Sequence, residues 1–141
     1  MSHRALFGCI LASLAFVGII DSGYVAINSL MHFIVPCGIA KGCEEVLNSP
    51  YARIRGISIA WGGVAFYISM MFAGIFAAYG FGRILRLTLP IAVLAFAFTL
   101  YLFYLQAFVI LAFCDYCLLS ALLVTLSLAI HLVTRAWKKA S

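Results

Sequence analysis

Residues 87–113 read LTLPIAVLAFAFTLYLFYLQAFVILAF, a stretch of 27 residues without one charged side chain. A helix needs about 20 apolar residues to cross the hydrocarbon core of a membrane, so this stretch is long enough to span it. Lipid offers no hydrogen-bond partner to the backbone, and a helix satisfies its amides within its own segment. The stretch therefore predicts a transmembrane helix, at about residues 86–111.

The same composition extends over the whole chain, whose 141 residues are 67% hydrophobic and 9% charged. This composition excludes an ordinary soluble domain, and the short alternating segments of a membrane β-barrel are absent from the sequence. Three further apolar runs predict helices at about residues 5–31, 57–79 and 114–136. We therefore expect a single all-α transmembrane domain of four helices, with a loop at about residues 34–56 outside the bilayer.

The basic residues that flank these runs predict the orientation of the chain. Cytoplasmic loops of membrane proteins carry an excess of Lys and Arg. If the N-terminus is cytoplasmic, six basic residues lie on that side and three on the other, so both termini are expected inside. The net charge of +5 then needs no nucleic-acid partner. The six are Arg4, Arg83, Arg86, Arg135, Lys138 and Lys139, and the three are Lys41, Arg53 and Arg55.

Four of the five cysteines fall on the predicted outer face. They are Cys37, Cys43, Cys114 and Cys117, whereas Cys9 lies within the first helix. Disulfides persist in oxidising compartments such as the bacterial periplasm and the lumen of the endoplasmic reticulum. We expect a bacterial inner-membrane protein with a periplasmic site, and the endoplasmic reticulum membrane is the alternative.

Cys114-Asp115-Tyr116-Cys117 is a C-x-x-C motif at the predicted start of a helix. Side chains three residues apart on a helix are about 5–6 Å apart, close enough for a disulfide. Unpaired amides and the dipole at a helix N-terminus also stabilise a thiolate. The motif predicts a redox-active pair; half of a zinc site is the alternative.

Cys37 and Cys43 form a C-x5-C motif in the outer loop. Alone, the motif is typical of a static disulfide, but beside the C-x-x-C pair it permits a relay by thiol–disulfide exchange. A relay at the bilayer boundary needs a two-electron acceptor, and a lipid-soluble quinone fits. Aromatic residues are candidates to line its pocket, with lipid contact or helix packing as the alternative for each: Trp61, Phe66, Tyr67, Phe103, Tyr104, Phe108 and Phe113.

Two segments carry a resemblance to a known family. Residues 43–52 read CEEVLNSPYA, followed by Arg55-Gly56-Ile57, and residues 114–121 read CDYCLLSA. Together with the C-x5-C loop, this order and spacing resembles the bacterial members of the vitamin K epoxide reductase family. The resemblance implies a four-helix bundle around a quinone, such as ubiquinone or menaquinone, capped by a loop with a short surface helix at about residues 42–49.

The resemblance also implies roles for individual residues. Cys37 and Cys43 would be the shuttle pair that meets a separate protein with a thioredoxin-like fold. Cys43 would exchange with Cys114, Cys117 would face the quinone, and Ser49 would support the site by hydrogen bonding. Vertebrate members carry a tyrosine four residues after the motif, where this chain has Ala121, so reduction of vitamin K epoxide is not implied.

Two other classes of protein fit part of the pattern. The disulfide-bond protein B family also has four helices and two outer dithiols, but its C-x-x-C motif lies in the first outer loop, the reverse of the order here. A non-enzymatic membrane protein with two static disulfides would leave both pairs inert to mild reductant. Asp21, within the first helix, is expected to face the bundle or water, because a charge in lipid is costly.

Overall fold

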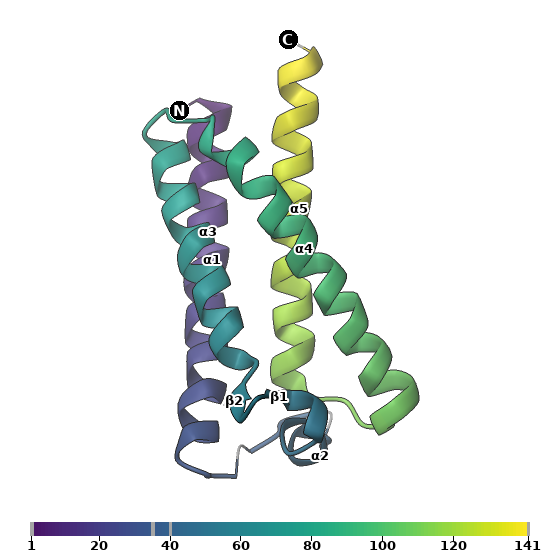
Figure 1. Cartoon of the computed structure of the whole chain (residues 1–141). Coiled ribbons are helices and arrows are strands. Elements are labelled where there is room, and N and C mark those ends of the chain that lie inside the picture. Colours follow the sequence, from purple (N-terminus) through teal and green to yellow (C-terminus); the bar gives the residue numbers. More distant parts are fainter. Residues whose placement is uncertain (1, 35, 40, 141) are drawn as a thin grey trace.

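The computed structural model describes residues 2–34, 36–39 and 41–140, and its framework is a bundle of long helices (Figure 1). Four helices in this part of the chain are long and apolar enough to cross a membrane. They are α1 (His3–Leu30), α3 (Ala60–Ala78), α4 (Ile84–Tyr104, continued to Ile110 by a π-helical segment) and α5 (Asp115–Ala140). The predicted fold class, an all-α membrane bundle, is confirmed.

Each long helix overlaps one of the predicted ranges, and the largest differences are at the start of α3 and the end of α5. Helix α3 begins at Ala60 rather than near residue 57, because residues 57–58 belong to a small hairpin. Helix α5 continues to Ala140, beyond the predicted end at residue 136. Lys138 and Lys139 occupy its last turn, where positive charge interacts favourably with the helix dipole.

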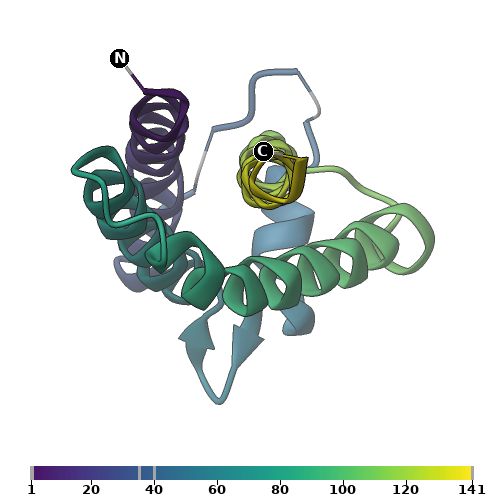
Figure 2. The ribbon, with the colours of Figure 1, turned by 90° about the horizontal axis from the view of Figure 1, so that it is seen from above.

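Helices α1 and α3 run side by side, whereas α4 and α5 cross obliquely (Figures 1 and 2). Glycine permits the close approach of the first pair. A Cβ atom added at Gly8 would lie 2.6 Å from the Gly74 carbonyl oxygen, and one added at Gly74 would lie 2.6 Å from the Ala12 amide nitrogen. Small residues allow such backbone contact between membrane helices. The buried side chains that fill this part of the core include Leu11, Ala15, Met70, Ala73 and Ala77.

The loop between α1 and α3 caps the end of the bundle that lies opposite the two termini (Figure 1). It contains the short helix α2 (Cys43–Leu47), a 3-10 turn η1 (Pro50–Ala52) and an antiparallel pair of strands, β1 (Arg53–Ile54) and β2 (Ile57–Ser58). The predicted surface helix is thus present. The strands are joined by Arg55 and Gly56, both with positive φ (53° and 83°), as a two-residue hairpin turn requires.

A π-helical segment, η2 (Leu105–Ile110), ends the third span. Leu111 follows in the left-handed conformation, with φ 59°, and the chain then turns into α5. This turn returns the backbone to the bundle, where Phe113 packs against Gly42, and it places the C-x-x-C motif against the loop. The cap and the start of α5 therefore form one unit at the end of the bundle.

Candidate functional site

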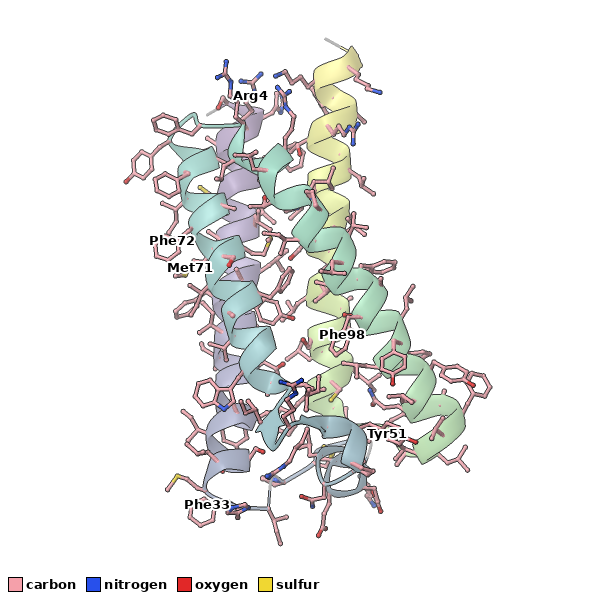
Figure 3. The ribbon with its side chains drawn as sticks, in the orientation of Figure 1. Arg4, Phe33, Tyr51, Met71, Phe72 and Phe98 are labelled. Atoms are coloured by element: carbon pink, nitrogen blue, oxygen red, sulfur yellow. A yellow bond between two sulfur atoms is a disulfide. The ribbon has the colours of Figure 1, made fainter. Side chains whose placement is uncertain are left out.

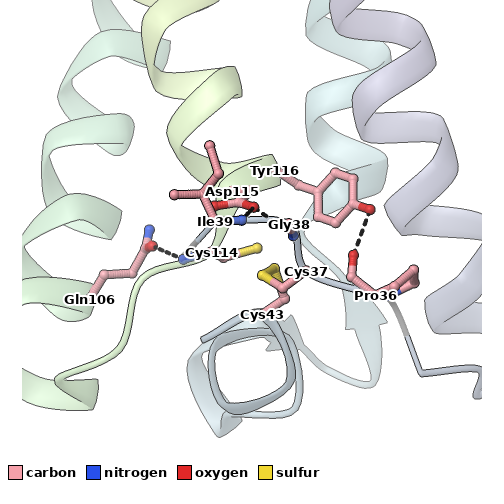
Figure 4. The surroundings of a disulfide bond; sticks show 9 residues. All are labelled: Pro36, Cys37, Gly38, Ile39, Cys43, Gln106, Cys114, Asp115 and Tyr116. Carbon is pink, nitrogen blue, oxygen red and sulfur yellow. Dashed lines mark hydrogen bonds between the residues drawn. A yellow bond between two sulfur atoms is a disulfide. The ribbon is translucent and has the colours of Figure 1, made fainter. Parts of the chain in front are cut away.

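The four outer cysteines come together where α2 meets the start of α5. Cys37 and Cys43 are joined by a disulfide, with their Cα atoms 5.7 Å apart, and Cys114 and Cys117 are free thiols. All four belong to one packed cluster, in which Cys43 and Cys114 are almost completely buried. Figure 4 shows the Cys114 sulfur directed toward the disulfide. The two pairs, 71 positions apart from Cys43 to Cys114, are therefore neighbours in space.

Gly42 allows this approach. It is the residue before α2, and a Cβ atom added there would lie 2.7 Å from the Phe113 amide nitrogen and would also collide with the Phe113 carbonyl oxygen. The backbone of residue 42 thus packs directly on the backbone that precedes Cys114. Any larger residue would force α2, and with it Cys43, away from Cys114.

The two residues inside the C-x-x-C motif hold the loop that carries the disulfide (Figure 4). The backbone N–H groups of Gly38 and Ile39 donate to Asp115 Oδ2 over 2.8 and 2.7 Å. The Tyr116 hydroxyl donates to the Pro36 carbonyl oxygen over 2.8 Å. These contacts lie on both sides of Cys37, so the C-x-x-C motif itself fixes the position of the Cys37–Cys43 disulfide.

Cys114 lies between the third span and α5, in an environment that favours its thiolate. Its backbone N–H donates to Gln106 Oε1 over 3.1 Å, within a buried site. The Cys117 thiol and the backbone N–H groups of Cys117 and Tyr116 donate hydrogen bonds to the Cys114 sulfur. These hydrogen bonds lower the pKa of Cys114 from 9.0 to about 7. Burial and the Asp115 charge oppose this shift but do not cancel it. Cys114 is therefore suited to be a nucleophile or a leaving group at neutral pH.

Cys117 faces a different environment, a cavity of about 530 Å³ between the helices. The wall of the cavity is mostly apolar, and its volume is within the usual range for small-molecule sites. Its polar residues include Asp21, Ser49, Tyr67, Gln106 and Ser120. Asp21 is the one acidic residue among the lining residues that the structure describes, and its Oδ1 atom has no hydrogen-bond partner there.

Four of the predicted site residues line this cavity: Cys117, Ser49, Phe66 and Tyr67. Of the other aromatic candidates, Phe103 also lines it, whereas the described lining does not include Trp61, Tyr104, Phe108 or Phe113. Trp61 is 41% exposed and Phe113 is 38% exposed on the outside of the bundle. The Ser49 hydroxyl donates to the Val46 carbonyl oxygen over 2.7 Å, so it closes the turn after α2 at the cavity wall.

Sequence reasoning did not identify the parts that Asp115 and Tyr116 play in holding the loop. The sequence does contain an indication of these roles, because an acidic residue and a tyrosine lie between two cysteines in the first turn of a predicted helix. Polar side chains at that position lie next to whatever loop packs on the helix end. Sequence alone does not say which loop that is, because Gly38 and Asp115 are 77 positions apart. Two of the four clustered cysteines are joined in a disulfide, and residues 2–34, 36–39 and 41–140 contain no group of three or more His, Cys, Asp or Glu that could hold a metal ion.

Comparison with known proteins identifies the family of the chain. No curated protein matches the chain. The model of the vitamin K epoxide reductase family matches residues 9–132, which is most of the chain and includes all four clustered cysteines. The chain therefore belongs to the vitamin K epoxide reductase family.

Proposed function

We propose that this chain, a membrane thiol–disulfide oxidoreductase by its family, reoxidises a thioredoxin-like partner and passes the electrons to a membrane quinone, in support of disulfide bond formation. One observation carries the proposal. The Cys37–Cys43 disulfide packs against Cys114, while Cys117 lines an apolar cavity large enough for a quinone ring. The packed cysteines thus extend from the loop to the cavity.

Electrons enter at Cys37. Cys43 is 1% exposed, whereas Cys37 is only partly buried, so a partner thiolate reaches Cys37 more easily. Attack on the Cys37 sulfur forms a mixed disulfide with the partner and releases Cys43 as a thiolate. The second thiolate of the partner then attacks its own sulfur in the mixed disulfide. The partner leaves oxidised, and Cys37 and Cys43 are both reduced.

Internal exchange follows at Cys43 and Cys114. The Cys43 thiolate attacks Cys114 of an oxidised Cys114–Cys117 pair and displaces Cys117 as a thiolate. Cys37 then attacks Cys43, which restores the Cys37–Cys43 disulfide and leaves both thiols of the C-x-x-C motif reduced. This product has the cysteine states that the structure contains, a Cys37–Cys43 disulfide with free Cys114 and Cys117.

The cavity beside Cys117 fits a quinone such as ubiquinone or menaquinone. A bound quinone accepts two electrons and two protons. Cys117 lines the cavity, whose wall is mostly apolar. The unpaired Oδ1 of Asp21 is available to take a proton from a thiol, because it lines the same cavity and has no hydrogen-bond partner among the described residues.

The proposed location is a bacterial inner membrane, with the cysteine end in the periplasm and both termini in the cytoplasm; the endoplasmic reticulum membrane is the alternative. The distribution of charge supports this orientation. Six basic residues lie around one cavity at the end of the bundle that carries the termini, against three in the loop, as the excess of positive charge on cytoplasmic segments predicts.

The proposal is tested by quinone reduction in detergent. Purified protein is supplied with a dithiol and a short-chain ubiquinone or menaquinone, and quinol formation is followed by absorbance. Wild type and Cys9→Ala are expected to be active, since Cys9 lies in α1 outside the cluster. Cys117→Ala is expected to be inactive. If wild type reduces neither quinone, or if Cys117→Ala equals Cys9→Ala, the proposed relay is wrong.

A further inference from the structure

A second cavity, of about 1120 Å³, lies at the end of the bundle opposite the cysteines. We call it the basic cavity, because six of its lining residues are cationic. They come from α1, from the α3–α4 connection with the start of α4, and from the end of α5: Arg4, Arg83, Arg86, Arg135, Lys138 and Lys139. Figure 3 shows Arg4 at this end, far from Tyr51 and Phe33 in the cap.

No acidic side chain balances these cations. The chain has four acidic residues, and none lines the basic cavity. Asp21 lies in the quinone-sized cavity, and Glu44, Glu45 and Asp115 lie in α2 and at the start of α5. Like charges around one cavity repel one another, and a low-dielectric wall strengthens their field. An anion bound at the cavity would therefore stabilise this arrangement of cations.

The wall below the cations is apolar. It is formed by side chains at the adjoining ends of α3 and α4: Phe76, Phe81, Ile84, Leu85 and Leu89. His131 also lines the cavity, but both of its ring nitrogens already have partners, the Thr88 hydroxyl at 2.9 Å and the Ser127 carbonyl at 2.7 Å. The cavity thus combines charged side chains at its rim with hydrocarbon beneath, at the level where the spans end.

We propose that the basic cavity binds the headgroup of an anionic phospholipid, with the adjoining part of the acyl chains against the apolar wall. A phospholipid is the amphiphile present at this depth of a bilayer, and basic pockets between membrane helices bind such headgroups. A free phosphate would leave the apolar wall uncovered. The excess of positive charge expected on cytoplasmic segments accounts for the number of cations, but not for their arrangement around one cavity. A bound lipid would tie together the ends of α1, α4 and α5.

Lipid binding by the purified full-length chain tests this inference. The probes are dioleoyl phosphatidylglycerol and dioleoyl phosphatidylcholine, titrated in detergent and followed by native mass spectrometry and thermal unfolding. We expect phosphatidylglycerol to bind and to raise the midpoint of unfolding, and phosphatidylcholine to do neither. Arg83→Gln/Arg86→Gln should weaken phosphatidylglycerol binding by about thirtyfold, from about fivefold for each basic side chain.

The matched control is Lys41→Gln/Arg55→Gln, which removes the same charge from exposed positions of the opposite end. It should bind phosphatidylglycerol as wild type does, and Arg83→Lys/Arg86→Lys should recover most of the affinity. Equal binding of the two lipids, or equal loss in the two Gln pairs, would overturn the proposal. So would displacement of the lipid by inorganic phosphate at equal concentration, since the site would then take the free anion.

Discussion

Asp115 accepts a hydrogen bond from the backbone N–H of Gly38 over 2.8 Å, which joins the interior of the C-x-x-C motif to the residue after Cys37. The same oxygen accepts from Ile39. A carboxylate makes stronger hydrogen bonds than a neutral acceptor. Asp115 thus acts as a positioning residue that keeps the loop disulfide over Cys114.

Asp115→Asn should slow dithiol-dependent quinone reduction about tenfold, because two charge-assisted bonds become neutral ones at a loss of about 1 kcal/mol or less each. Tyr116→Phe removes the single bond to the Pro36 carbonyl and should have a smaller effect. Glu45→Gln is the matched control, since it removes one negative charge from an exposed position of α2. Equal rates for Asp115→Asn and Glu45→Gln would show that the loop needs no such support.

The proposed exchange partners can be trapped. In Cys37→Ala/Cys117→Ala, the remaining outer cysteines are Cys43 and Cys114, which pack in one buried cluster. We expect them to form a disulfide on mild oxidation, detected by mass spectrometry of unreduced peptides. The variant Cys37→Ala/Cys114→Ala retains Cys43 and Cys117, and it should form little disulfide between them. The reverse preference would place the exchange at Cys117 instead.

The thiolate of Cys114 should titrate near neutral pH. Because its pKa is lowered from 9.0 to about 7, the thiolate is present above pH 7 and is lost as the pH falls below it. In a Cys9→Ala background, the alkylation rate of Cys114 should increase with pH, and the midpoint of that increase should lie near pH 7. Adding Cys117→Ala removes the main hydrogen bond to the thiolate and should move the midpoint toward 9. A midpoint that stays at 7 would assign the shift to the backbone amides alone.

Gly42→Ala should both destabilise the cap and impair exchange. Its added methyl would meet the backbone of Phe113, which cannot move aside as a flexible side chain can, and overpacking of this kind costs about 1–3 kcal/mol. Gly23→Ala in α1 is the control, because its added Cβ meets nothing within 4 Å. The midpoint of thermal unfolding and the rate of quinone reduction should both fall in Gly42→Ala. Both should stay at wild-type values in Gly23→Ala.

Asp21→Asn should separate stability from activity. The Oδ1 atom of this buried carboxyl has no partner among the described residues, and a buried charge without a partner destabilises the fold more than a neutral amide does. Replacement by the neutral amide should leave the unfolding temperature unchanged or raise it, while quinone reduction falls because the proton acceptor is lost. Full activity in this variant would remove Asp21 from the proposed mechanism.

The sequence predicts the spans well, because a run of about 20 apolar residues has few alternatives in a chain of this composition. It predicts the faces of those spans poorly. A helix that is apolar on all sides gives no periodic signal of which side is inward. Phe66 and Tyr67 line the cavity, whereas Trp61, five residues before Phe66, does not. The sequence also does not predict the hairpin that precedes α3, since its strands have only two residues each.

All four clustered cysteines and the cavity next to Cys117 lie at one end of the bundle. In the proposed relay, electrons therefore pass from Cys37 to Cys117 without crossing the bilayer. Protons released from the thiols can reach the acceptor within the same leaflet. Turnover is then electroneutral with respect to the membrane: it neither consumes nor generates a transmembrane voltage, and a collapse of that voltage by an ionophore should leave the rate unchanged.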